Sequence, residues 1–193
     1  RHSLRLPGDI PTQNWVSALH HDRTGTLWAG TVWGLHRAAP APPPFRLLAH
    51  DPDDPNSLGS GIILSIHRDA QGTMWVGTLG GGLNRIGADG RVTRYRSGPA
   101  GSPTHDWIWA LASDDRTLWI GTGLSLDAVD LDQPSRVRRV ALNAGQDPHN
   151  PEGAQGLWTD ADQTLWFGFR GRLWRKTARG DTASTAAPFA RGI

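Results

Sequence analysis

The sequence contains no cysteine, one glutamate and one lysine among its 193 residues. The lack of cysteine excludes a disulfide framework, cysteine-based zinc sites and a thiol nucleophile. Because Glu152 is the single glutamate, a glycosidase built on paired carboxylates would have to use aspartates. No apolar run approaches the roughly 18 residues of a membrane-spanning helix. The chain begins at Arg1, from which we expect a processed or excised piece of a longer protein.

Several function signatures are missing as well. The formal net charge is only +2, and no basic run is longer than Arg138-Arg139, so no nucleic-acid partner is predicted. The sequence has no Gly-x-Ser-x-Gly elbow, no His-Glu-x-x-His pair and no phosphate-binding loop. These absences argue against the best-defined hydrolase, metalloprotease and nucleotide-binding sites.

Turn-forming residues and tryptophan are abundant instead. The chain has 24 glycines, 14 prolines and 10 tryptophans. Glycine and proline at this frequency indicate many turns between short strands. No apolar stripe with a period of 3.6 residues is present, so no helix is predicted. The composition therefore predicts an all-β chain.

The sequence repeats itself four times around one tryptophan. The repeated residues are Trp28, Trp75, Trp119 and Trp166, which are 47, 44 and 47 residues apart. An aliphatic residue stands nine positions before each tryptophan, or eight in the third copy, and a small residue precedes it. These aliphatic residues are Leu19, Ile66, Leu111 and Leu157. Apolar residues alternate with others at a period of two, which indicates strands.

Each copy divides into four short strands, as the second copy shows. We predict strands near Ile62 to His67, Thr73 to Thr78, Gly82 to Ile86 and Arg91 to Tyr95, with an aspartate-to-glycine turn from Asp69 to Gly72. Four strands in a repeat of about 40 to 50 residues are typical of a β-propeller blade. The prediction is a partial propeller of four-stranded antiparallel blades over residues 1–193. Its repeats fall at 14–49, 61–96, 106–142 and 154–189.

The second copy resembles a known family. Residues 51–58 (DPDDPNSL), 74–78 (MWVGT) and 81–85 (GGLNR) are similar to the two-component regulator propeller repeat. The first copy departs from it at residues 32–35. The third copy has a shorter turn, and the fourth has Gln163 in place of the turn glycine.

This resemblance implies the periplasmic ligand-sensing region of a bacterial receptor. Such a region has about seven blades and is attached to a membrane segment and a cytoplasmic histidine kinase or diguanylate cyclase. The implied partners are the remaining blades, the signalling domains and, as a further option, a second copy in a homodimer. Four blades would leave two sheet faces unpaired, so the chain is expected to be part of a larger propeller. The resemblance also implies that this part of the receptor has no enzymatic activity of its own.

The non-repeating residues are the candidate ligand-binding residues. The recurring tryptophans are predicted to pack blade against blade. The loops from an outer strand to the next inner strand, and those between the two middle strands, should emerge on one face of the propeller. The residues expected there are Asn14, Trp15, Trp33, His105, Asp106, Trp107, Gln155 and Arg170. A rim of aromatic and polar side chains suits a saccharide or a similar polar solute.

Three alternatives to a saccharide-binding sensor are a metal site, an enzyme and a protein-binding scaffold. Residues 51–56 are rich in aspartate and resemble a calcium-binding loop, but Pro52 and Pro55 interrupt them. A solvated turn is therefore predicted there, and neither a metal nor a cofactor is predicted. A propeller lyase or hydrolase would need a histidine beside a divalent metal, for which His105 and Asp106 are the candidates. A protein-binding scaffold is the third alternative.

Overall fold

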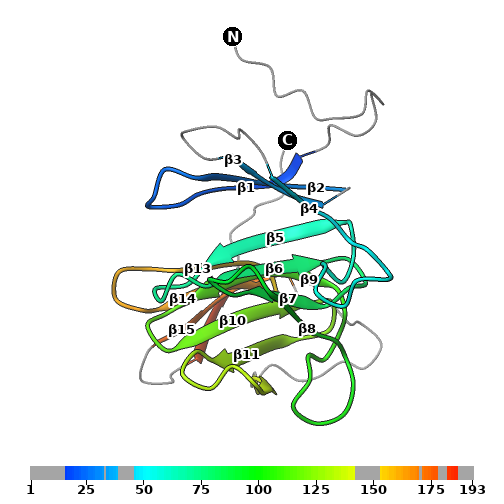
Figure 1. Ribbon diagram of the computed structural model, residues 1–193. Coiled ribbons are helices and arrows are strands. Elements are labelled where there is room, and N and C mark those ends of the chain that lie inside the picture. The colour runs from blue at the N-terminus through cyan, green and yellow to red at the C-terminus, as the bar shows by residue number, and fades with distance from the viewer. Residues whose placement is uncertain are drawn as a thin grey trace, which may run out of the picture.

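The computed structural model describes residues 16–32, 34–38, 46–141, 153–169, 171–177 and 182–186. Every regular element in these ranges is a β-strand (Figure 1). In this part of the chain there is accordingly no helix of the length and apolarity needed to span a membrane.

The sixteen strands form four antiparallel sheets of four strands each. The first sheet consists of β1 (Val16–His21), β2 (Leu27–Thr31), β3 (Gly34–Ala38) and β4 (Arg46–Leu48). The second consists of β5 (Ile63–Arg68), β6 (Met74–Thr78), β7 (Leu83–Ile86) and β8 (Val92–Tyr95). The third consists of β9 (Ile108–Ser113), β10 (Thr117–Thr122), β11 (Leu126–Asp130) and β12 (Val137–Arg139). The fourth consists of β13 (Gln155–Thr159), β14 (Leu165–Phe169), β15 (Arg172–Lys176) and β16 (Thr182–Ala186).

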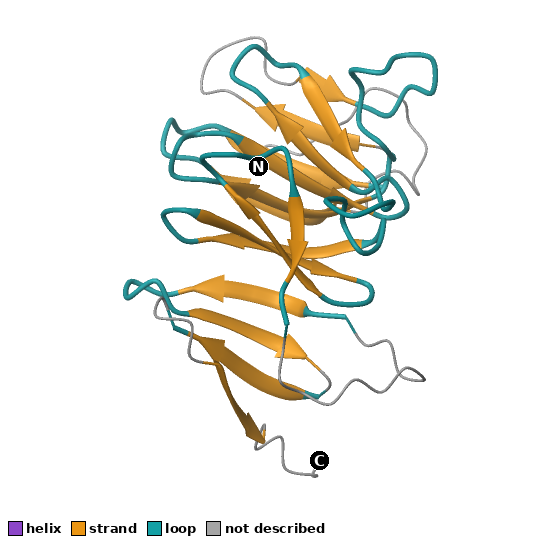
Figure 2. Ribbon diagram, turned by 90° about the horizontal axis from the view of Figure 1, so that it is seen from below, coloured by secondary structure: helices purple, strands orange, loops and turns teal. Residues whose placement is uncertain are grey.

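The strands run in sequence order across each sheet, and the four sheets are stacked face to face, one after another (Figure 2). The inner strand of each sheet contacts the inner strand of the next, from β1 to β5, β9 and β13. The prediction of an all-β chain of propeller blades is confirmed. In the second copy, the strands predicted from the sequence agree with β5 to β8 to within one residue.

The turn between the first two strands of each sheet carries the same aspartate–tryptophan hydrogen bond. The indole Nε1 of Trp75 donates to a carboxylate oxygen of Asp69 at 2.8 Å, and the Thr73 amide donates to the other oxygen at 2.8 Å. The equivalent indole-to-carboxylate distances are 3.0, 3.0 and 2.9 Å for Trp28–Asp22, Trp119–Asp114 and Trp166–Asp160. The predicted turn from Asp69 to Gly72 is confirmed, with φ of 87° at Gly72.

These bonds lower the pKa of two aspartates. Burial alone would raise the pKa of Asp22, but hydrogen bonds from Thr24, Trp28 and Thr26 outweigh burial and hold it below its usual value. The pKa of Asp160 is also lowered, chiefly by the hydrogen bond from Trp166. The ionised carboxylates thus hold the turns closed.

Successive sheets join through one repeated arrangement. We call the face that carries the repeated tryptophan the back face of a sheet, and the opposite one its front face. Trp75 and Leu83 on the back face of the second sheet pack with Ile108, Leu118 and Ile120 of the third. Trp28 and Trp119 stand in equivalent clusters with the second and fourth sheets. The prediction that repeated tryptophans pack blade against blade is therefore confirmed at all three joints.

Candidate functional site

The connection between β8 and β9 is held in place by a buried carboxylate. Asp127 of β11 accepts hydrogen bonds from the amide of Thr104 at 2.7 Å and from its hydroxyl at 2.9 Å. Burial raises the pKa of Asp127, and the bonds from Thr104 and Ser125 oppose that rise. Because Thr104 is fixed to β11 in this way, the position of the next residue, His105, is fixed as well.

His105, Trp107 and Trp109 form a ledge of three aromatic rings, which we call the aromatic ledge. The rings of His105 and Trp107 meet edge to face with centroids 5.0 Å apart, and those of Trp107 and Trp109 do so at 6.2 Å. Trp107 and Trp109 are 45% and 37% exposed. His105 packs against Gly123, where a Cβ atom would lie only 3.0 Å from Nδ1. The ledge therefore offers apolar ring surface to solvent at the start of an inner strand.

The polar atoms of the ledge are oriented by the backbone. Nδ1 of His105 accepts a hydrogen bond from the Trp107 amide at 2.9 Å, which places the proton of the neutral ring on Nε2. The carbonyl of Trp107 accepts from the Gly123 amide at 2.9 Å. Nε2 of His105 is thereby the ring nitrogen available to a ligand as a donor.

Asp106 serves mainly to hold two loops together. Its carbonyl accepts hydrogen bonds from the amides of Gly80 and Gly82, both at 3.0 Å, and its carboxylate accepts from the Ser97 amide at 2.6 Å. Gly80 and Gly82 lie in the turn between the middle strands of the second sheet. The two kinds of loop predicted to share one face of the propeller are therefore in direct contact.

A β-bulge recurs at the start of every inner strand. Each bulge places one extra residue on the inner strand without a partner on the second strand of its sheet. The extra residues are Ser17, Leu64, Trp109 and Gly156. A bulge redirects the side chain that it carries. In the third sheet that side chain is Trp109 of the aromatic ledge, which was not among the site residues predicted from the sequence.

Of the other predicted residues, Gln155 lies in the described part of the chain. It begins β13, is exposed and pairs with Gly168. Since β13 contacts β9, Gln155 starts the inner strand beside the one that carries Trp109. Asn14, Trp15, Trp33 and Arg170 lie outside the described residues. Their place in the site stays a prediction.

A hollow lies at the opposite end of the inner strands from the aromatic ledge. The turns between the first and second strands of all four sheets contribute to its wall, and its volume is about 600 Å³. Its charged and imidazole-bearing lining residues are His20, His21, Asp22, Arg23, Arg68, Asp69, Asp114 and Asp115. Arg68 is paired with Asp22 at 3.3 Å across the first joint. Because three of the four aspartates also hold the repeated turns, much of this polar lining has a structural role.

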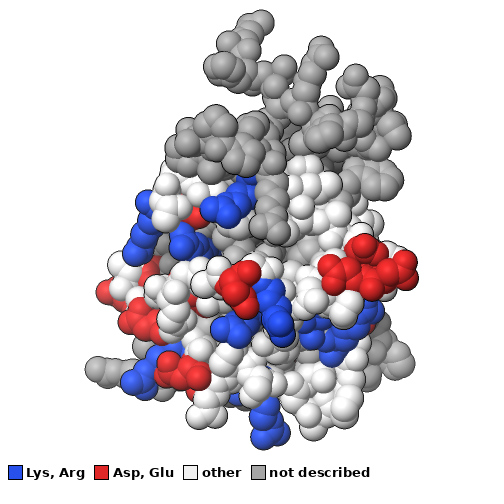
Figure 3. Space-filling model, in the orientation of Figure 1, with Lys and Arg blue, Asp and Glu red and all other residues white. Residues whose placement is uncertain are grey.

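Charge is distributed evenly over the visible surface. Figure 3 shows basic and acidic side chains interspersed on the face in view. Within the described ranges, no group of three or more histidine, aspartate or glutamate side chains is placed to hold a metal ion. The feature that distinguishes the aromatic ledge is its set of ring contacts.

Four four-stranded antiparallel sheets joined through their inner strands define the β-propeller class. Residues 57–80 match the family described as the two component regulator propeller. The chain therefore carries a repeat of that family in its second blade, and the resemblance expected from the sequence is confirmed. None of the curated proteins matches the sequence.

Solved structures share the fold at low sequence identity. The extracellular domain of BT3049 from B. thetaiotaomicron, described as a hybrid two component system, aligns over 94% of this chain with a TM-score of 0.73 and 19% identity. Virginiamycin B lyase from Staphylococcus aureus aligns over 94% with a TM-score of 0.70 and 17% identity. The chain spans 25% of the first protein and 58% of the second. The extracellular domain of BT4673 from B. thetaiotaomicron aligns with a TM-score of 0.57 and 19% identity. The alignment covers 95% of this chain and 32% of that protein.

Proposed function

We propose that this chain is a ligand-sensing propeller segment of a bacterial signal-transduction receptor and is located in the periplasm. The family repeat in the second blade supports this proposal, and so do two structural neighbours, the extracellular domain of BT3049, described as a hybrid two component system, and that of BT4673, described as a one component system. The ligand is a saccharide or a similar polar solute, which is bound and released without turnover.

The observation that carries the ligand class is the aromatic ledge. Trp107 and Trp109 expose 45% and 37% of their surface to solvent, and rings of this size suit the flat apolar surface of a sugar. Nε2 of His105 adds a hydrogen-bond donor beside them. Gln155 would add an amide from the next inner strand. Stacking surface next to a few oriented polar groups is the usual make-up of a small-molecule site.

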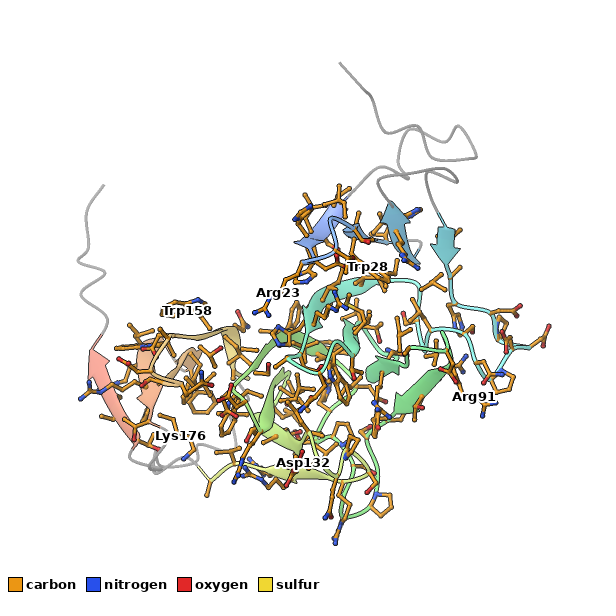
Figure 4. The ribbon with its side chains drawn as sticks, turned by 60° about the vertical axis from the view of Figure 1, so that its left-hand side comes forward. Arg23, Trp28, Arg91, Asp132, Trp158 and Lys176 are labelled. Carbon is orange, nitrogen blue, oxygen red and sulfur yellow. The ribbon has the colours of Figure 1, made fainter. Side chains whose placement is uncertain are left out.

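Calorimetry of the chain against a panel of oligosaccharides tests this proposal. We expect binding by one glycan class, a loss of affinity of at least about tenfold in Trp107→Ala and in Trp109→Ala, and no change in Trp158→Ala. Trp158, which is labelled in Figure 4, is a matched control because it is an exposed tryptophan of β13 in the fourth sheet, whereas Trp107 and Trp109 lie at the start of β9 in the third. Equal losses in all three variants, or no binding by any glycan, would contradict the ligand class.

The same samples distinguish a sensor from a lyase. Mass spectrometry of the bound glycan after prolonged incubation with and without divalent metal should recover it intact. Conversion that requires metal and is lost in His105→Ala would replace the sensor with the enzyme alternative.

A further inference from the structure

The joint between the first and second sheets and the joint between the second and third are lined by matching residues. In each joint the back face of one sheet meets the front face of the next, and the strand pairing repeats in register. The matched residues are Leu35 with Leu83, Ile63 with Ile108, Ile66 with Leu111, Met74 with Leu118, Val76 with Ile120, Ile86 with Val129 and Val92 with Val137. Since the members of each pair are similar in size, the two joints are equivalent over most of their area.

Two further positions differ in size between these joints. Leu48 stands at the first joint where Tyr95 stands at the second, since each pairs with the matched leucine of its third strand. In the turn between the third and fourth strands, Ala88 holds the position of Leu131, two residues after the last matched residue of the third strand. Tyr95 and Leu131 pack with Trp75, and the rings of Tyr95 and Trp75 lie 6.1 Å apart. A leucine and an alanine fill less of this space at the first joint.

A cleft of about 260 Å³ opens at the first joint beside these two smaller residues. Leu48 and Ala88 both line it, and Trp28, Met74 and Ile86 supply its apolar wall. The repeated tryptophan is 8% exposed here and 1% exposed at the second joint. Most small-molecule sites have volumes of about 300 to 1,000 Å³, so the ligand of this cleft must be small. Both blades that form the cleft belong to this chain, and no other blade is needed to complete it.

Two arginines flank the cleft. Arg68 is paired with Asp22 at 3.3 Å, and the same carboxylate accepts the hydrogen bond from Trp28. Arg37 is exposed, and its guanidinium lies over the Trp28 ring at 5.5 Å from the centroid. Among the described residues, no acidic side chain forms an ion pair with Arg37. The charged lining residues therefore carry an excess of one positive charge, which belongs to Arg37.

We propose that this cleft binds a small organic acid, with its apolar group against Trp28 and Met74 and its carboxylate on the guanidinium of Arg37. Removing an apolar group from water supplies affinity. A guanidinium offers two parallel donors to a carboxylate, which favours an acid over a neutral ligand of the same shape. The cleft lies at the end of the sheets that carries the aspartate turns. It is therefore a second site, and the inference does not depend on the saccharide proposed for the aromatic ledge.

Calorimetry at pH 7 against small acids and their alcohols tests the ligand class. The probes are hexanoate, 3-methylbutanoate and 3-phenylpropionate, each compared with the primary alcohol of the same carbon skeleton. We expect at least one acid to bind with a Kd below about 1 mM, and at least about tenfold more tightly than its alcohol. Failure of all three acids to bind at about 5 mM, or equal affinity for an acid and its alcohol, would overturn the proposal.

Filling the cleft tests its location. Ala88→Leu introduces the residue of the third sheet and should weaken binding of the acid at least about 30-fold without lowering the melting temperature. Leu48→Tyr, the second filling variant, should have the same effect. Ala161→Leu is the matched control, since Ala161 is an exposed alanine in the turn between β13 and β14, and it should bind normally. A folded Ala88→Leu chain with unchanged affinity, or an equal loss in the control, would refute the location.

Removing the cation tests the carboxylate contact without filling the cleft. Arg37→Gln should weaken binding of the acid about tenfold and leave any binding of the alcohol unchanged. Arg116→Gln is its control, because Arg116 is exposed between β9 and β10. An equal loss for acid and alcohol in Arg37→Gln would contradict the contact. Trp107→Ala should not affect binding of the acid, so failure of the saccharide site and failure of this cleft can be told apart.

Discussion

The two ends of the inner strands differ in how strictly the blades repeat. At the end with the aspartate turns, all four sheets make the same indole-to-carboxylate bond at 2.8 to 3.0 Å. At the other end, the bulge residues are serine, leucine, tryptophan and glycine in the four sheets. The strict end serves the fold, since each blade needs the same turn. The variable end is the one to which the proposed function assigns the ligand, since its side chains carry no common structural task.

The largest expected difference is between two tryptophans of the third sheet. Trp119 lies in a joint with the fourth sheet, and Trp109 lies on the ledge. Trp119→Ala should lower the free energy of unfolding by about 4 kcal/mol, because it leaves a cavity in the core, and Trp109→Ala by about 1 kcal/mol. Urea denaturation followed by circular dichroism measures both. Similar losses would erase the distinction between the two ends.

The aspartate turn should be nearly as sensitive. Asp69→Ala leaves the buried indole N–H of Trp75 without an acceptor, so we expect a loss of about 3 kcal/mol of unfolding free energy. Asp89→Ala is the control in the same sheet, since Asp89 accepts one bond from the exposed Arg91 amide. Its loss should stay below about 1 kcal/mol. If the two variants were equally stable, the hydrogen bond between Asp69 and Trp75 would contribute nothing measurable to stability.

The aspartate-turn end also predicts a pH effect on stability. Burial, and then the nearby His20, lowers the pKa of His67 from 6.5 to about 4, against the opposing charge of Asp69. The unfolded chain therefore takes up this proton first as the pH falls. The contribution of His67 to the free energy of unfolding should be fully present above pH 6.5. It should fall by about 2 kcal/mol towards pH 4, a figure that is reduced because the ring is partly exposed.

The measurement is the unfolding free energy between pH 7.5 and 4.5. His67→Gln keeps an amide near the hydroxyl of Ser113, which lies 2.8 Å from Nε2 of His67, but cannot take up the proton. The variant should show a shallower decline over this range. An unchanged slope would assign the pH dependence to other groups.

The smallest expected effect concerns the fourth turn, in which glutamine replaces the turn glycine. Gln163 has φ of 60°, whereas Gly25 and Gly72 hold the equivalent positions at 80° and 87°. Gln163→Gly should relieve left-handed strain and raise the melting temperature through a gain of about 1 kcal/mol. Part of that gain is offset because Oε1 of Gln163 accepts a hydrogen bond from the Asp115 amide at 3.0 Å. A clear loss of stability would mean that this bond outweighs the strain.

The fold could be predicted from the sequence because the repeat recurs at constant spacing. Period-two alternation located β5 to β8 to within one residue, and the turn chemistry at Asp69 was explicit. The aspartate–tryptophan bond could also have been predicted, since an aspartate stands six residues before three of the tryptophans and five before Trp119. The total of about seven blades and the repeat boundaries stay predictions.

The candidate site was predicted less completely. Trp107 and His105 stand out because they break the repeat, but nothing in the local sequence marks Trp109 as a bulge residue, since the bulge is defined by its partner strand. The ring contact between Trp107 and Trp109 depends on that redirected side chain. The structural role of Asp106 could not be predicted either. Its carbonyl and carboxylate oxygens accept hydrogen bonds from backbone amides that are distant in sequence, in the turn at Gly80 and at Ser97.

The recurring bulge makes one position per blade exchangeable. Its residue has no cross-strand partner, so replacing its side chain leaves the ladder of hydrogen bonds intact. For the proposed sensor, exchanges at positions 64 and 109 would therefore alter the binding surface without disturbing the scaffold. Ser17 is more constrained, because its hydroxyl donates to the carbonyl oxygens of Gly30 and of Ile63 in the second sheet. If the proposed function holds, a library varied at positions 64 and 109 would change ligand specificity on one unchanged backbone.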